Sequence, residues 1–456
     1  MYTRTSFKDR RLALAGFGAE GQSAADFLLR MGARLEISDS KPESEFPTEV
    51  VARIRELGAV FHFGQLGPFT GFDGIIRSPG ISPHVPELVT AAKKGIPFTS
   101  ATKIFFDLCP APIVGVTGTK GKGTTASLIY QMLKGAGRDA YLCGNIGTPA
   151  LDFLDRLNEG SIVVYELSSF QLLEMERSPH IAVVLMVTSE HLDFHKTAEE
   201  YVGAKANLVR FQGPGDYAIV NMDYPASRAM AAMTKAEVFA VSRKKRPANG
   251  TYVENGFVTL IQKGQSRQIL PIDAVPLAGA HNLENVCAAA MTAALLGVPS
   301  AITAAAIQYF KALPHRLEFI RETAGVKYYD DSISTTPESA IAALRSFGVP
   351  KILILGGSSK GADWREFAAE LTADHSLKAI IGIGQEWPKI KAALAATGRE
   401  VQAIEGLQNM SAVVAAAAEL AAPGNIVILS PACASFGMFR NYQDRGEQFS
   451  AAVRAL

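Results

Sequence analysis

The chain has 456 residues, of which 48% are hydrophobic and 20% are charged, which excludes a disordered chain and allows several buried cores. Its 45 basic residues nearly balance its 44 acidic ones, which disfavours a nucleic-acid-binding protein. Four scattered cysteines without a CxxC pair disfavour a disulfide scaffold and a zinc site. The start of the chain is polar, and no apolar run reaches the roughly 18 residues of a membrane helix, so we expect a soluble cytoplasmic protein.

The first block of the chain alternates apolar strands with a glycine turn and a helix. A strand at 12–15 runs into the turn Gly16-Phe-Gly-Ala-Glu-Gly21, and an amphipathic helix is expected at about 23–31. Two further strands are expected at 34–38 and within 72–80. Strands that alternate with helices in this way predict α/β units with a parallel sheet.

Two more blocks follow the same pattern after a linker at 107–112 that contains two prolines. The second block contains a helix at about 123–135 and an alanine-rich helical segment at 278–296, and it ends at a short linker near 311–314. The expected strands of these two blocks lie at 113–117, 162–166, 182–187, 216–221, 351–355, 379–383 and 426–430.

A glycine-rich segment, Gly115-Val-Thr-Gly-Thr-Lys-Gly-Lys-Gly-Thr-Thr125, lies between an expected strand and an expected helix. Glycines let backbone N–H groups surround a phosphate, the helix N-terminus adds partial positive charge, and Lys122 can reach the outer phosphates. The segment departs from the pattern GxxxxGK[ST], because Val116 replaces the first glycine and Gly123 replaces the hydroxyl residue. The strand–loop–helix context favours a nucleotide site over a plain glycine turn.

Polar side chains follow two strands of the second block. Glu166 ends the strand at 162–166, and His191 and Asp193 follow the strand at 182–187. The carboxyl ends of parallel strands are where open α/β sheets bind ligands, and a carboxylate beside a phosphate loop suits magnesium. A lone loop histidine is often structural or solvated, but the strand-end position favours a functional role for His191 as much as a structural one.

Six motifs, in this order, resemble those of the Mur ligase family. They are Thr117-Gly-Thr-Lys-Gly-Lys-Gly-Thr-Thr125, Glu166-Leu-Ser-Ser-Phe-Gln-Leu172, His191-Leu-Asp193, His281-Asn-Leu-Glu-Asn285, Pro314-His-Arg-Leu-Glu318 and Ser430-Pro-Ala-Cys-Ala-Ser435. The resemblance spans nearly the whole chain and implies an α/β fold of three domains. These are a Rossmann-like UDP-substrate-binding domain at 1–109, a central P-loop ATPase-type domain with a parallel sheet at 110–312, and a Rossmann-like amino-acid-binding domain at 313–456.

Within this family, the chain resembles most the ligases that add glutamate to UDP-N-acetylmuramoyl-L-alanine in bacterial cell-wall synthesis. The resemblance implies that ATP phosphorylates the alanine carboxylate, that the glutamate amine attacks the acyl phosphate, and that the tetrahedral intermediate then loses phosphate. Lys122, magnesium and the loop amides would offset the repulsion between the carboxylate and the triphosphate. It also implies small-molecule partners, no nucleic acid, no membrane and a monomer.

The resemblance assigns roles to individual residues. The catalytic positions are Lys122, Glu166, His191 and Lys205, and Lys205 matches a lysine that is carbamylated in most family members. Two magnesium sites are expected, with ligands among Thr124, Glu166 and His191. The ATP-binding positions are Gly118, Thr119, Lys120, Gly121, Lys122, Gly123, Thr124, Thr125, Asn282, Asn285, Arg316 and Asp331.

Two further sets of positions concern the other substrates. The UDP-substrate positions are Gly18, Ala19, Glu20, Asp39, Ser78, Pro79, Gly80 and Asn145. The glutamate positions are Thr335, Lys360, Ser435, Phe436 and Tyr442. Glu20 is an unusual residue beside a diphosphate, because like charges repel. We expect its side chain either to point away from the phosphates or to bind sugar hydroxyls.

Three residues depart from the family pattern. Gly123 replaces the hydroxyl residue after the loop lysine, Glu190 replaces an aspartate before the motif histidine, and Ile333 replaces a lysine near the amino-acid subsite. The loss of that lysine removes one positive charge, so the stereochemistry of the substrate stays open. D-Glutamate is the default by family frequency, and L-glutamate is the alternative.

Parts of the sequence are also compatible with three other functions. Gly16-x-Gly-x-x-Gly21 alone would suggest an NAD-dependent oxidoreductase, but that reading leaves the second phosphate loop and Glu166 unexplained. Folylpolyglutamate synthase shares the phosphate loop but lacks a UDP-binding N-terminal domain. An inactive nucleotide-binding regulator stays open because of Gly123.

Overall fold

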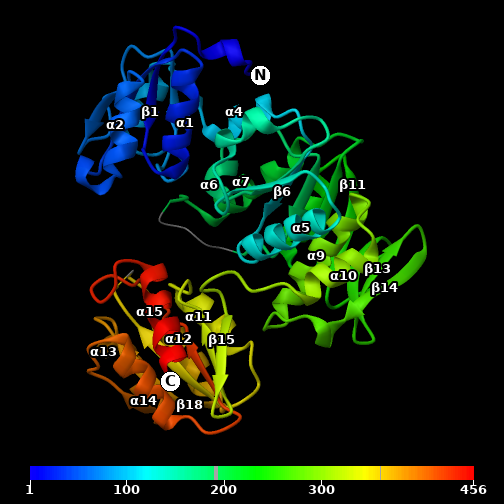
Figure 1. Cartoon of the computed structure of the whole chain (residues 1–456), viewed down its shortest axis with the longest axis vertical. Coiled ribbons are helices and arrows are strands. Elements are labelled where there is room, and N and C mark those ends of the chain that lie inside the picture. The colour runs from blue at the N-terminus through cyan, green and yellow to red at the C-terminus, as the bar shows by residue number, and fades with distance from the viewer. Residues whose placement is uncertain (189–193, 360) are drawn as a thin grey trace. The chain divides into compact units, whose positions relative to one another are not determined.

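The computed structural model describes residues 1–188, 194–359 and 361–456. It divides into two compact units, Met1–Ala274 with Leu283–Gln308, and Val275–Asn282 with Tyr309–Leu456. Three mostly parallel sheets follow one another along the chain, and the first unit contains the first two of them (Figure 1). The predicted α/β fold of three domains is confirmed.

The N-terminal sheet has five parallel strands in the order β3-β2-β1-β4-β5. Leu12 and Leu14 of β1 pack in one hydrophobic cluster with residues of α1 and α2, whereas Ala13 and Ala15 pack on the other face against α3. The elements are β1 Arg11–Ala15, α1 Ala19–Arg30, β2 Arg34–Asp39, α2 Thr48–Glu56, β3 Val60–Phe63, β4 Gly74–Arg77, α3 Pro86–Lys93, β5 Phe98–Thr99 and α4 Ala101–Leu108.

Helix α1 begins at Ala19, four residues before the predicted start at 23. Gly18 has an extended backbone and directly precedes the first helical residue, so the helix begins inside the glycine turn. The predicted UDP-substrate residues Ala19 and Glu20 therefore lie in the first helical turn, where backbone N–H groups have no intrahelical acceptor.

The central sheet has nine strands in the order β14-β13-β12-β11-β10-β9-β6-β8-β7. Strands β6 to β12 pair in parallel, and β13 and β14 extend the sheet as antiparallel strands. The strands are β6 Ile113–Thr117, β7 Ala140–Gly144, β8 Ile162–Glu166, β9 Ile181–Val184, β10 Tyr217–Asn221, β11 Glu237–Ser242, β12 Gly250–Glu254, β13 Phe257–Gln262 and β14 Gln265–Pro271. The helices are α5 Lys122–Gly135, α6 Ser169–Leu172, α7 Ala198–Arg210, α8 Pro225–Met230, α9 His281–Leu295 and α10 Ser300–Gln308.

Strand β9 ends at Val184, so the prediction that this strand continues to residue 187 was wrong. The backbone beyond Val184 bonds to the phosphate loop: the N–H of Leu185 donates to the carbonyl of Thr117 at 2.9 Å, and the carbonyl of Met186 accepts from the N–H of Thr119 at 2.7 Å. The apolar residues after Val184 thus support the loop.

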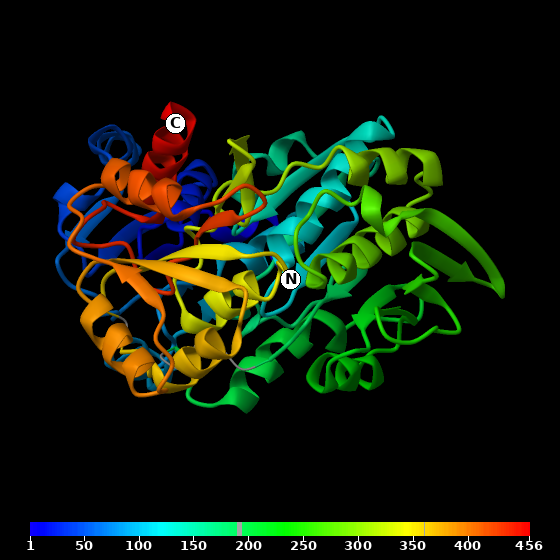
Figure 2. The ribbon, with the colours of Figure 1, turned by 90° about the horizontal axis from the view of Figure 1, so that it is seen from below.

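The C-terminal sheet has the order β15-β16-β20-β17-β18-β19, and only the β15–β16 pair is antiparallel. Leu353 and Leu355 of β17 pack in a cluster with α11, α12 and α13, whereas Ile352 and Ile354 pack with α14 and α15, so helices cover both faces (Figure 2). The elements are β15 Glu318–Thr323, β16 Val326–Asp330, α11 Pro337–Leu344, β17 Lys351–Gly356, α12 Arg365–Ala373, β18 Leu377–Ile383, α13 Trp387–Ala395, β19 Gln402–Ile404, α14 Met410–Leu420, β20 Ile426–Leu429 and α15 Tyr442–Ala455.

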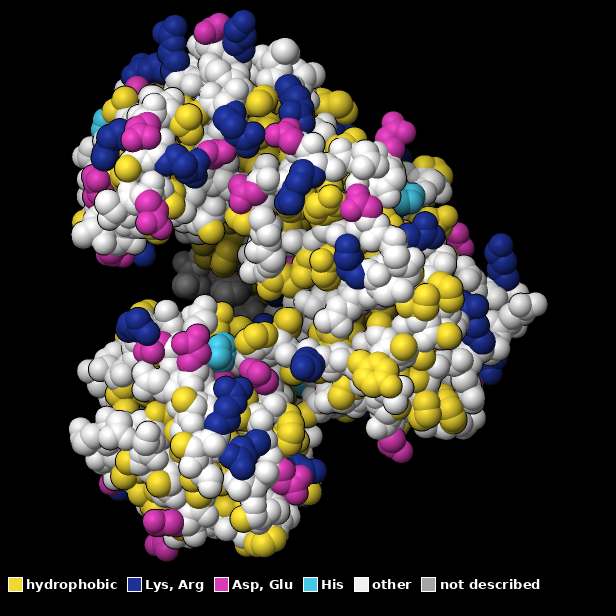
Figure 3. Space-filling model, viewed as in Figure 1, with side chains coloured by type: hydrophobic (Ala, Val, Ile, Leu, Met, Phe, Trp, Pro, Cys, Tyr) yellow, Lys and Arg dark blue, Asp and Glu magenta, His cyan; other side chains and the backbone are white. Residues whose placement is uncertain are grey.

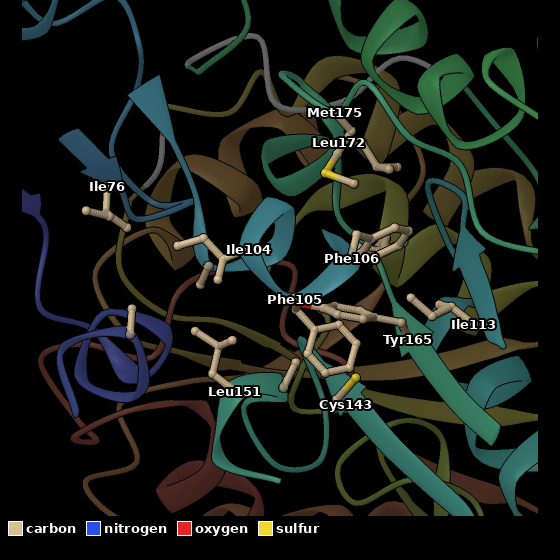
Figure 4. Packing of buried hydrophobic residues seen from close by; sticks show 14 of the residues in the cluster. Ile76, Ile104, Phe105, Phe106, Ile113, Cys143, Leu151, Tyr165, Leu172 and Met175 are labelled. Atoms are coloured by element: carbon tan, nitrogen blue, oxygen red, sulfur yellow. The ribbon is translucent and has the colours of Figure 1, made fainter. Parts of the chain in front are cut away.

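Helix α4 joins the first two sheets through a shared apolar core. Figure 4 shows Phe105 and Phe106 of this helix beside Tyr165 of β8. The ring centroids of Phe105 and Phe106 lie 5.7 Å and 5.9 Å from that of Tyr165. Aromatic side chains bury large apolar areas and dominate the energetics of protein cores. This core therefore holds the N-terminal sheet against the central one within the first unit.

Charged side chains of both signs are interspersed over the face drawn in Figure 3, as the near-zero net charge leads one to expect. Among the described residues, no helix combines the length and the apolar character that crossing a bilayer requires.

Candidate functional site

The phosphate loop connects β6 to α5, as predicted. Gly121, the residue before α5, has a φ of +87°, a backbone conformation that favours glycine. A Cβ atom at Gly121 would lie 2.1 Å from Oδ1 of Asn285, so the side chain of this predicted ATP-binding residue packs directly against the loop. Glycine is therefore required here both by the backbone conformation and by the close approach of Asn285.

Two lysines converge on one carbonyl of the loop. Nζ of Lys122 donates to the carbonyl oxygens of Gly118 and Thr119, each at 3.1 Å. Nζ of Lys205, a buried side chain, donates to the same carbonyl of Gly118 at 2.8 Å. Two ammonium groups that share an acceptor make this loop electropositive, which suits an anionic ligand.

Helix α7 presents Lys205 and Tyr201 to the loop because residues four apart lie on the same face of a helix. The hydroxyl of Tyr201 donates to Oγ1 of Thr119 at 3.0 Å, and Nζ of Lys205 lies 4.7 Å from the centre of the Tyr201 ring. Hydrogen bonds therefore hold both the side chain and the backbone of Thr119, because its N–H also donates to the carbonyl of Met186. No sequence motif indicated that Tyr201 contacts the loop.

Glu166 lies at the end of β8, directly beside β6, where it pairs in register with Val116. Its side chain is buried, and Oγ1 of Thr117 donates to the carbonyl of the next residue, Leu167, at 2.8 Å. The N–H of Asn145 approaches the carbonyl of Glu166 at 3.3 Å. The structure therefore brings Asn145, a predicted substrate residue, beside the predicted metal ligand.

The described part of this site is rich in oxygen ligands. Glu166 supplies a carboxylate, and Thr124 and Thr125 at the start of α5 supply buried hydroxyls. Carboxylate and hydroxyl oxygens are ligands that Mg²⁺ accepts in nucleotide sites, so these residues fit that ion. His191, the remaining predicted metal ligand, lies outside the described residues, as does Glu190.

The N-terminal glycine turn is closed by two of the predicted UDP-substrate residues. Oδ2 of Asp39 accepts a hydrogen bond from the N–H of Phe17 at 2.7 Å, and Oγ of Ser78 donates to the carbonyl of Gly16 at 2.7 Å. A Cβ atom at Gly21 would lie 2.3 Å from that same carbonyl oxygen. Asp39 and Ser78 therefore stabilise the conformation of the turn. Ala19 and Glu20 are the first residues of α1, which begins within it. Pro79 and the exposed Gly80 follow Ser78 at the end of β4.

Glu20 points toward the central domain. Its Oε1 accepts a hydrogen bond from Nε2 of Gln171 in α6 at 2.5 Å, and burial raises the pKa of its carboxyl group to about 7. The side chain of Gln171 also accepts from the N–H and the hydroxyl of Ser168 through Oε1, which caps α6. This hydrogen bond is one of several between the two domains of the first unit.

A buried arginine also connects the two domains of the first unit. The side chain of Arg77 at the end of β4 is 2% exposed, and its guanidinium donates to the carboxylate of Glu174 at 3.1 Å and to the carbonyl of Ile81 at 2.7 Å. Nε2 of His84 lies 3.0 Å from Oε1 of Glu200, which is on α7. The predicted UDP-substrate segment after Ser78 is therefore attached at both ends.

In the second unit, Asp331 is a buried carboxylate with several donors. It accepts from the hydroxyl of Ser430 at 2.8 Å and from the N–H of Leu317 at 3.1 Å, and Ser334 also donates to it. Burial raises its pKa to about 6, while these donors and nearby Arg316 lower it. Nε of Arg316 is buried without a hydrogen-bond partner among the residues described. Asn282, whose side chain donates to the carbonyl of Ala278, belongs to this unit.

Of the predicted glutamate residues that the structure describes, Thr335 lies on one loop of the second unit, Ser435 and Phe436 lie on another, and Tyr442 begins α15. Arg445 of α15 is fully buried and donates to the hydroxyl and the carbonyl of Ser332 at 2.9 Å and 2.8 Å, and to the carbonyl of Cys433 at 3.2 Å. The carbonyl of Tyr442 accepts from the hydroxyl of Ser332 at 2.8 Å. Thr335 follows Ser332 on the first loop. The buried Ser435 and the exposed Phe436 follow Cys433 on the second loop.

Two observations on this subsite were not foreseen. Nδ1 of His315 lies 2.7 Å from Oδ2 of Asp330, which raises the pKa of the imidazole, and the carbonyl of His315 accepts from the N–H of Ile333 at 3.1 Å. The ring of Tyr442 meets that of His315 edge to face at 6.1 Å. Lys360 lies outside the described residues. No sequence pattern distinguishes a buried Arg445 from a surface arginine on an amphipathic helix.

Three family models match the chain. The model described as the MurD-like N-terminal domain of Mur ligases matches residues 10–100, the Mur ligase middle domain matches 116–293, and the glutamate ligase domain of Mur ligases matches 315–433. A relative named UDP-N-acetylmuramoylalanine–D-glutamate ligase, from Symbiobacterium thermophilum, is 39% identical over 98% of both chains. One of the same name from Pelotomaculum thermopropionicum is 36% identical over 99% of this chain and 98% of its own.

Solved structures share the fold. UDP-N-acetylmuramate-alanine ligase MurC of Thermotoga maritima matches with a TM-score of 0.61 and 18% identity, over 98% of this chain and 99% of that one. MurF ligase of the same organism, in complex with ADP, matches with a TM-score of 0.59 and 18% identity, over 100% and 97%. The matches of sequence and fold extend over the full length of the chain, and the chain belongs to the Mur ligase family.

Proposed function

We propose that this protein is the ATP-dependent ligase that adds glutamate to UDP-N-acetylmuramoyl-L-alanine in peptidoglycan synthesis, by way of an acyl phosphate. D-Glutamate, the amino acid in the names of the relatives at 34–39% identity, is the default substrate. The observation that carries the proposal is the position of Lys122, whose Nζ donates to the phosphate loop beside the buried carboxylate of Glu166.

The residues of the first unit would bring two anions together. The loop from Gly118 to Thr125, with Lys120 and Gly123, would surround the phosphates of ATP, and Lys122 would neutralise charge on the transferred phosphoryl group. Mg²⁺ bound by Thr124 and Glu166, with His191 at a second ion, would supply further positive charge between phosphate and carboxylate. Asn145, beside Glu166, would orient the acceptor carboxylate.

We further propose that Lys205 is carbamylated in the active protein. A carbamate would replace a buried cation with an anion close to the phosphate loop, where it could order the metal region. The test is a Lys205→Ala variant assayed with and without bicarbonate or short carboxylates. Partial rescue of turnover by these anions is expected, and a variant that they leave unaffected would count against carbamylation.

The second unit would hold the other ends of the substrates. Arg316, Asp331 and Asn282 of this unit would bind the nucleotide, as would Asn285 of the first unit. Thr335, Lys360, Ser435, Phe436 and Tyr442 would form the glutamate subsite. The proposed domains are 1–109, 110–312 and 313–456, and the proposed state is a cytoplasmic monomer. We expect ligation to proceed only when the bound substrates are shielded from water, because water would hydrolyse the acyl phosphate.

The stereochemistry of glutamate is decided by one assay. Ile333 supplies no charge where the family pattern leads one to expect a lysine, so L-glutamate is the specific alternative. Initial rates with D- and L-glutamate at equal concentrations, with ATP and acceptor saturating, are compared. A rate with D-glutamate at least tenfold above that with L-glutamate supports the default, and the reverse ratio replaces it.

The ligase proposal as a whole is tested by phosphate release. Release should require both the UDP-linked acceptor and glutamate, whereas equal hydrolysis without either would identify a plain NTPase. Lys122→Ala and Glu166→Ala should each abolish turnover. Lys134→Ala changes an exposed lysine on the same helix and serves as the control with normal rates. Near-normal rates in both site variants would remove the assignment.

A further inference from the structure

Two consecutive residues near the start of α9 contact different parts of the central domain. Asn285 approaches the phosphate loop so closely that a Cβ atom added at Gly121 would lie 2.1 Å from its Oδ1. Its neighbour Glu284 contacts the end of strand β10 instead. Consecutive side chains of a helix point about 100° apart, so one short stretch of helix can face both structures. The family resemblance assigns no role to Glu284.

Glu284 is a buried carboxylate whose donors come from three segments of the first unit. Its Oε2 accepts a hydrogen bond from Nδ2 of Asn221 at 2.8 Å. Its Oε1 lies 3.4 Å from the hydroxyl of Tyr224 and 3.4 Å from Nε of Arg243. Asn221 ends β10, Tyr224 directly precedes α8, and Arg243 directly follows β11. Because a buried carboxylate is stable only with such donors, these contacts attach the start of α9 to the carboxyl ends of two central strands.

The donors that face Glu284 are themselves held in place by the turn after β10. Oδ1 of Asn221 accepts from the N–H of Asp223 at 3.0 Å, so only the NH₂ group of Asn221 is left for Glu284. The carboxylate of Asp223 accepts from the N–H of Arg243 at 2.8 Å and from the hydroxyl of Ser242 at 2.6 Å. Glu284 therefore bonds to a support that hydrogen bonds already fix on two strand ends.

We propose that Glu284 is a positioning residue for nucleotide binding, because it holds the start of α9 where the side chain of Asn285 meets the phosphate loop. The two residues are adjacent in one helix, so loss of the bond from Asn221 to Glu284 releases the stretch that carries Asn285. In this role Glu284 acts through Asn285. The inference rests on the proposed function, in which Asn285 binds ATP, and deepens it by assigning the support of that contact.

The body of α9 has supports of its own, which confines the effect of Glu284 to the start of the helix. The hydroxyl of Thr251 on β12 donates to the carbonyl of Cys287 at 2.7 Å. The side chains from Val286 to Met291 are buried in the first unit. We therefore expect a variant at Glu284 to keep the fold of the helix and to lose the fixed position of Asn285.

The test measures binding of MgADP to the full chain by calorimetry, without acceptor or glutamate. Glu284→Ala is compared with wild type and with Glu237→Ala, which removes an exposed carboxylate from β11 of the same sheet. We expect Glu284→Ala to weaken ADP binding by about fivefold to tenfold, the range for one lost hydrogen bond, and Glu237→Ala to bind as wild type does. Glu284→Gln should recover most of the affinity, because its side-chain oxygen can still accept from Asn221. Circular dichroism checks that each variant is folded.

Two further measurements separate a positioning role from general destabilisation. Asn285→Ala should weaken ADP binding, and adding Glu284→Ala to it should weaken binding no further, because Glu284 acts through Asn285. In turnover, Glu284→Ala should raise the KM for ATP and leave the KM for the UDP-linked acceptor within about twofold. Additive losses of ADP affinity, or equal rises of both KM values, would overturn the positioning role.

A second variant covers the case in which Glu284→Ala does not fold. Asn221→Ala removes the donor and keeps the carboxylate, and it should weaken ADP binding by a similar factor. Wild-type ADP affinity in a folded Glu284→Ala or Asn221→Ala protein overturns the inference alone. A wild-type protein that binds MgADP without turning over the acceptor overturns the proposed ligase, and the calorimetry still decides on Glu284. A wild-type protein that does not bind MgADP overturns both.

Discussion

Arg77 offers a quantitative test of how the first unit is held together. Replacing it with methionine keeps much of its apolar volume but removes the guanidinium, which bonds to Glu174 and to the carbonyl of Ile81. Breaking a buried ion pair by removing one partner costs about 3–5 kcal/mol, and the lower end applies because Glu174 is 31% exposed. We therefore expect Arg77→Met to lower the free energy of unfolding of this unit by about 3 kcal/mol.

The two tryptophans provide an internal reference for this measurement. Trp364 and Trp387 both lie in the second unit, so tryptophan fluorescence reports on that unit, while far-UV circular dichroism reports on both. With an m value of about 3 kcal/mol/M in urea, a loss of about 3 kcal/mol lowers the midpoint by about 1 M. The dichroism transition should shift by this amount in Arg77→Met, and the fluorescence transition should not.

The control is Arg34→Met, which changes an exposed arginine on strand β2 of the same sheet. This variant should unfold at the wild-type midpoint by both methods. A dichroism midpoint of Arg77→Met within about 0.3 M of wild type, about a third of the shift that a buried pair predicts, would refute the reasoning. Equal shifts of both transitions would show instead that the two units unfold together, so that Arg77 is not a local determinant.

The remaining predictions concern the phosphate loop and two buried carboxyl groups. Gly121→Ala should lower the affinity for ADP at least tenfold by calorimetry, because a Cβ atom would lie 2.1 Å from Oδ1 of Asn285; wild-type affinity would contradict the loop geometry. Burial raises the pKa of Glu20 from 4.5 to about 7. Native protein then binds more protons than unfolded protein between these values, so stability relative to Glu20→Gln should fall by up to about 3 kcal/mol as pH rises from 4.5 to 7, and stay level above it. For Asp331, with a pKa raised from 3.8 to about 6, the same fall should occur between pH 4 and 6 relative to Asp331→Asn, measured by tryptophan fluorescence; a pH-independent difference would contradict either claim.

Strands buried on both faces were predictable from the sequence. The predicted strands at 113–117 and 162–166 match β6 and β8 to the residue, because continuous apolar runs bounded by glycine or polar clusters have one reading in an α/β protein. The glycine turn and the phosphate loop were found for the same reason, since both stand between a strand and a helix. Local pattern did not suffice for every interior strand, because β9 was predicted to extend three residues too far and β11, β12 and β16 were not predicted.

Edge elements were missed because their sequences do not alternate or repeat in a distinctive way. Strand β14 is largely exposed and polar, and β19 has three residues, so neither has the apolar content on which strand prediction depends. The antiparallel strands β13 and β14 extend a parallel sheet. The alternation of strands and helices in an α/β sequence does not predict such an extension. In the site, Tyr201 and Arg445 act through contacts across long stretches of sequence, and a pattern of local residues contains no information on those contacts.

Arg445 connects the two loops that carry predicted glutamate-binding residues. Its planar guanidinium donates at once to the loop at Ser332 and to the loop at Cys433, and burial lowers its pKa to about 10, which still leaves it charged at neutral pH. Lysine has one donor group at the end of a flexible chain and cannot reproduce this fork. Arg445→Lys should therefore raise the KM for glutamate by about tenfold, the cost of one lost charge-assisted hydrogen bond.

The control for this prediction is Arg454→Lys, an exposed position on the same helix α15. Its kinetics should be those of wild type. In Arg445→Lys, the KM for the UDP-linked acceptor should stay unchanged, because the acceptor is assigned to residues of the first unit. Unfolding followed by the fluorescence of Trp364 and Trp387 shows whether the second unit remains native. A folded Arg445→Lys protein with wild-type KM for glutamate would mean that the two loops keep their positions without the arginine, and the subsite would then need another support.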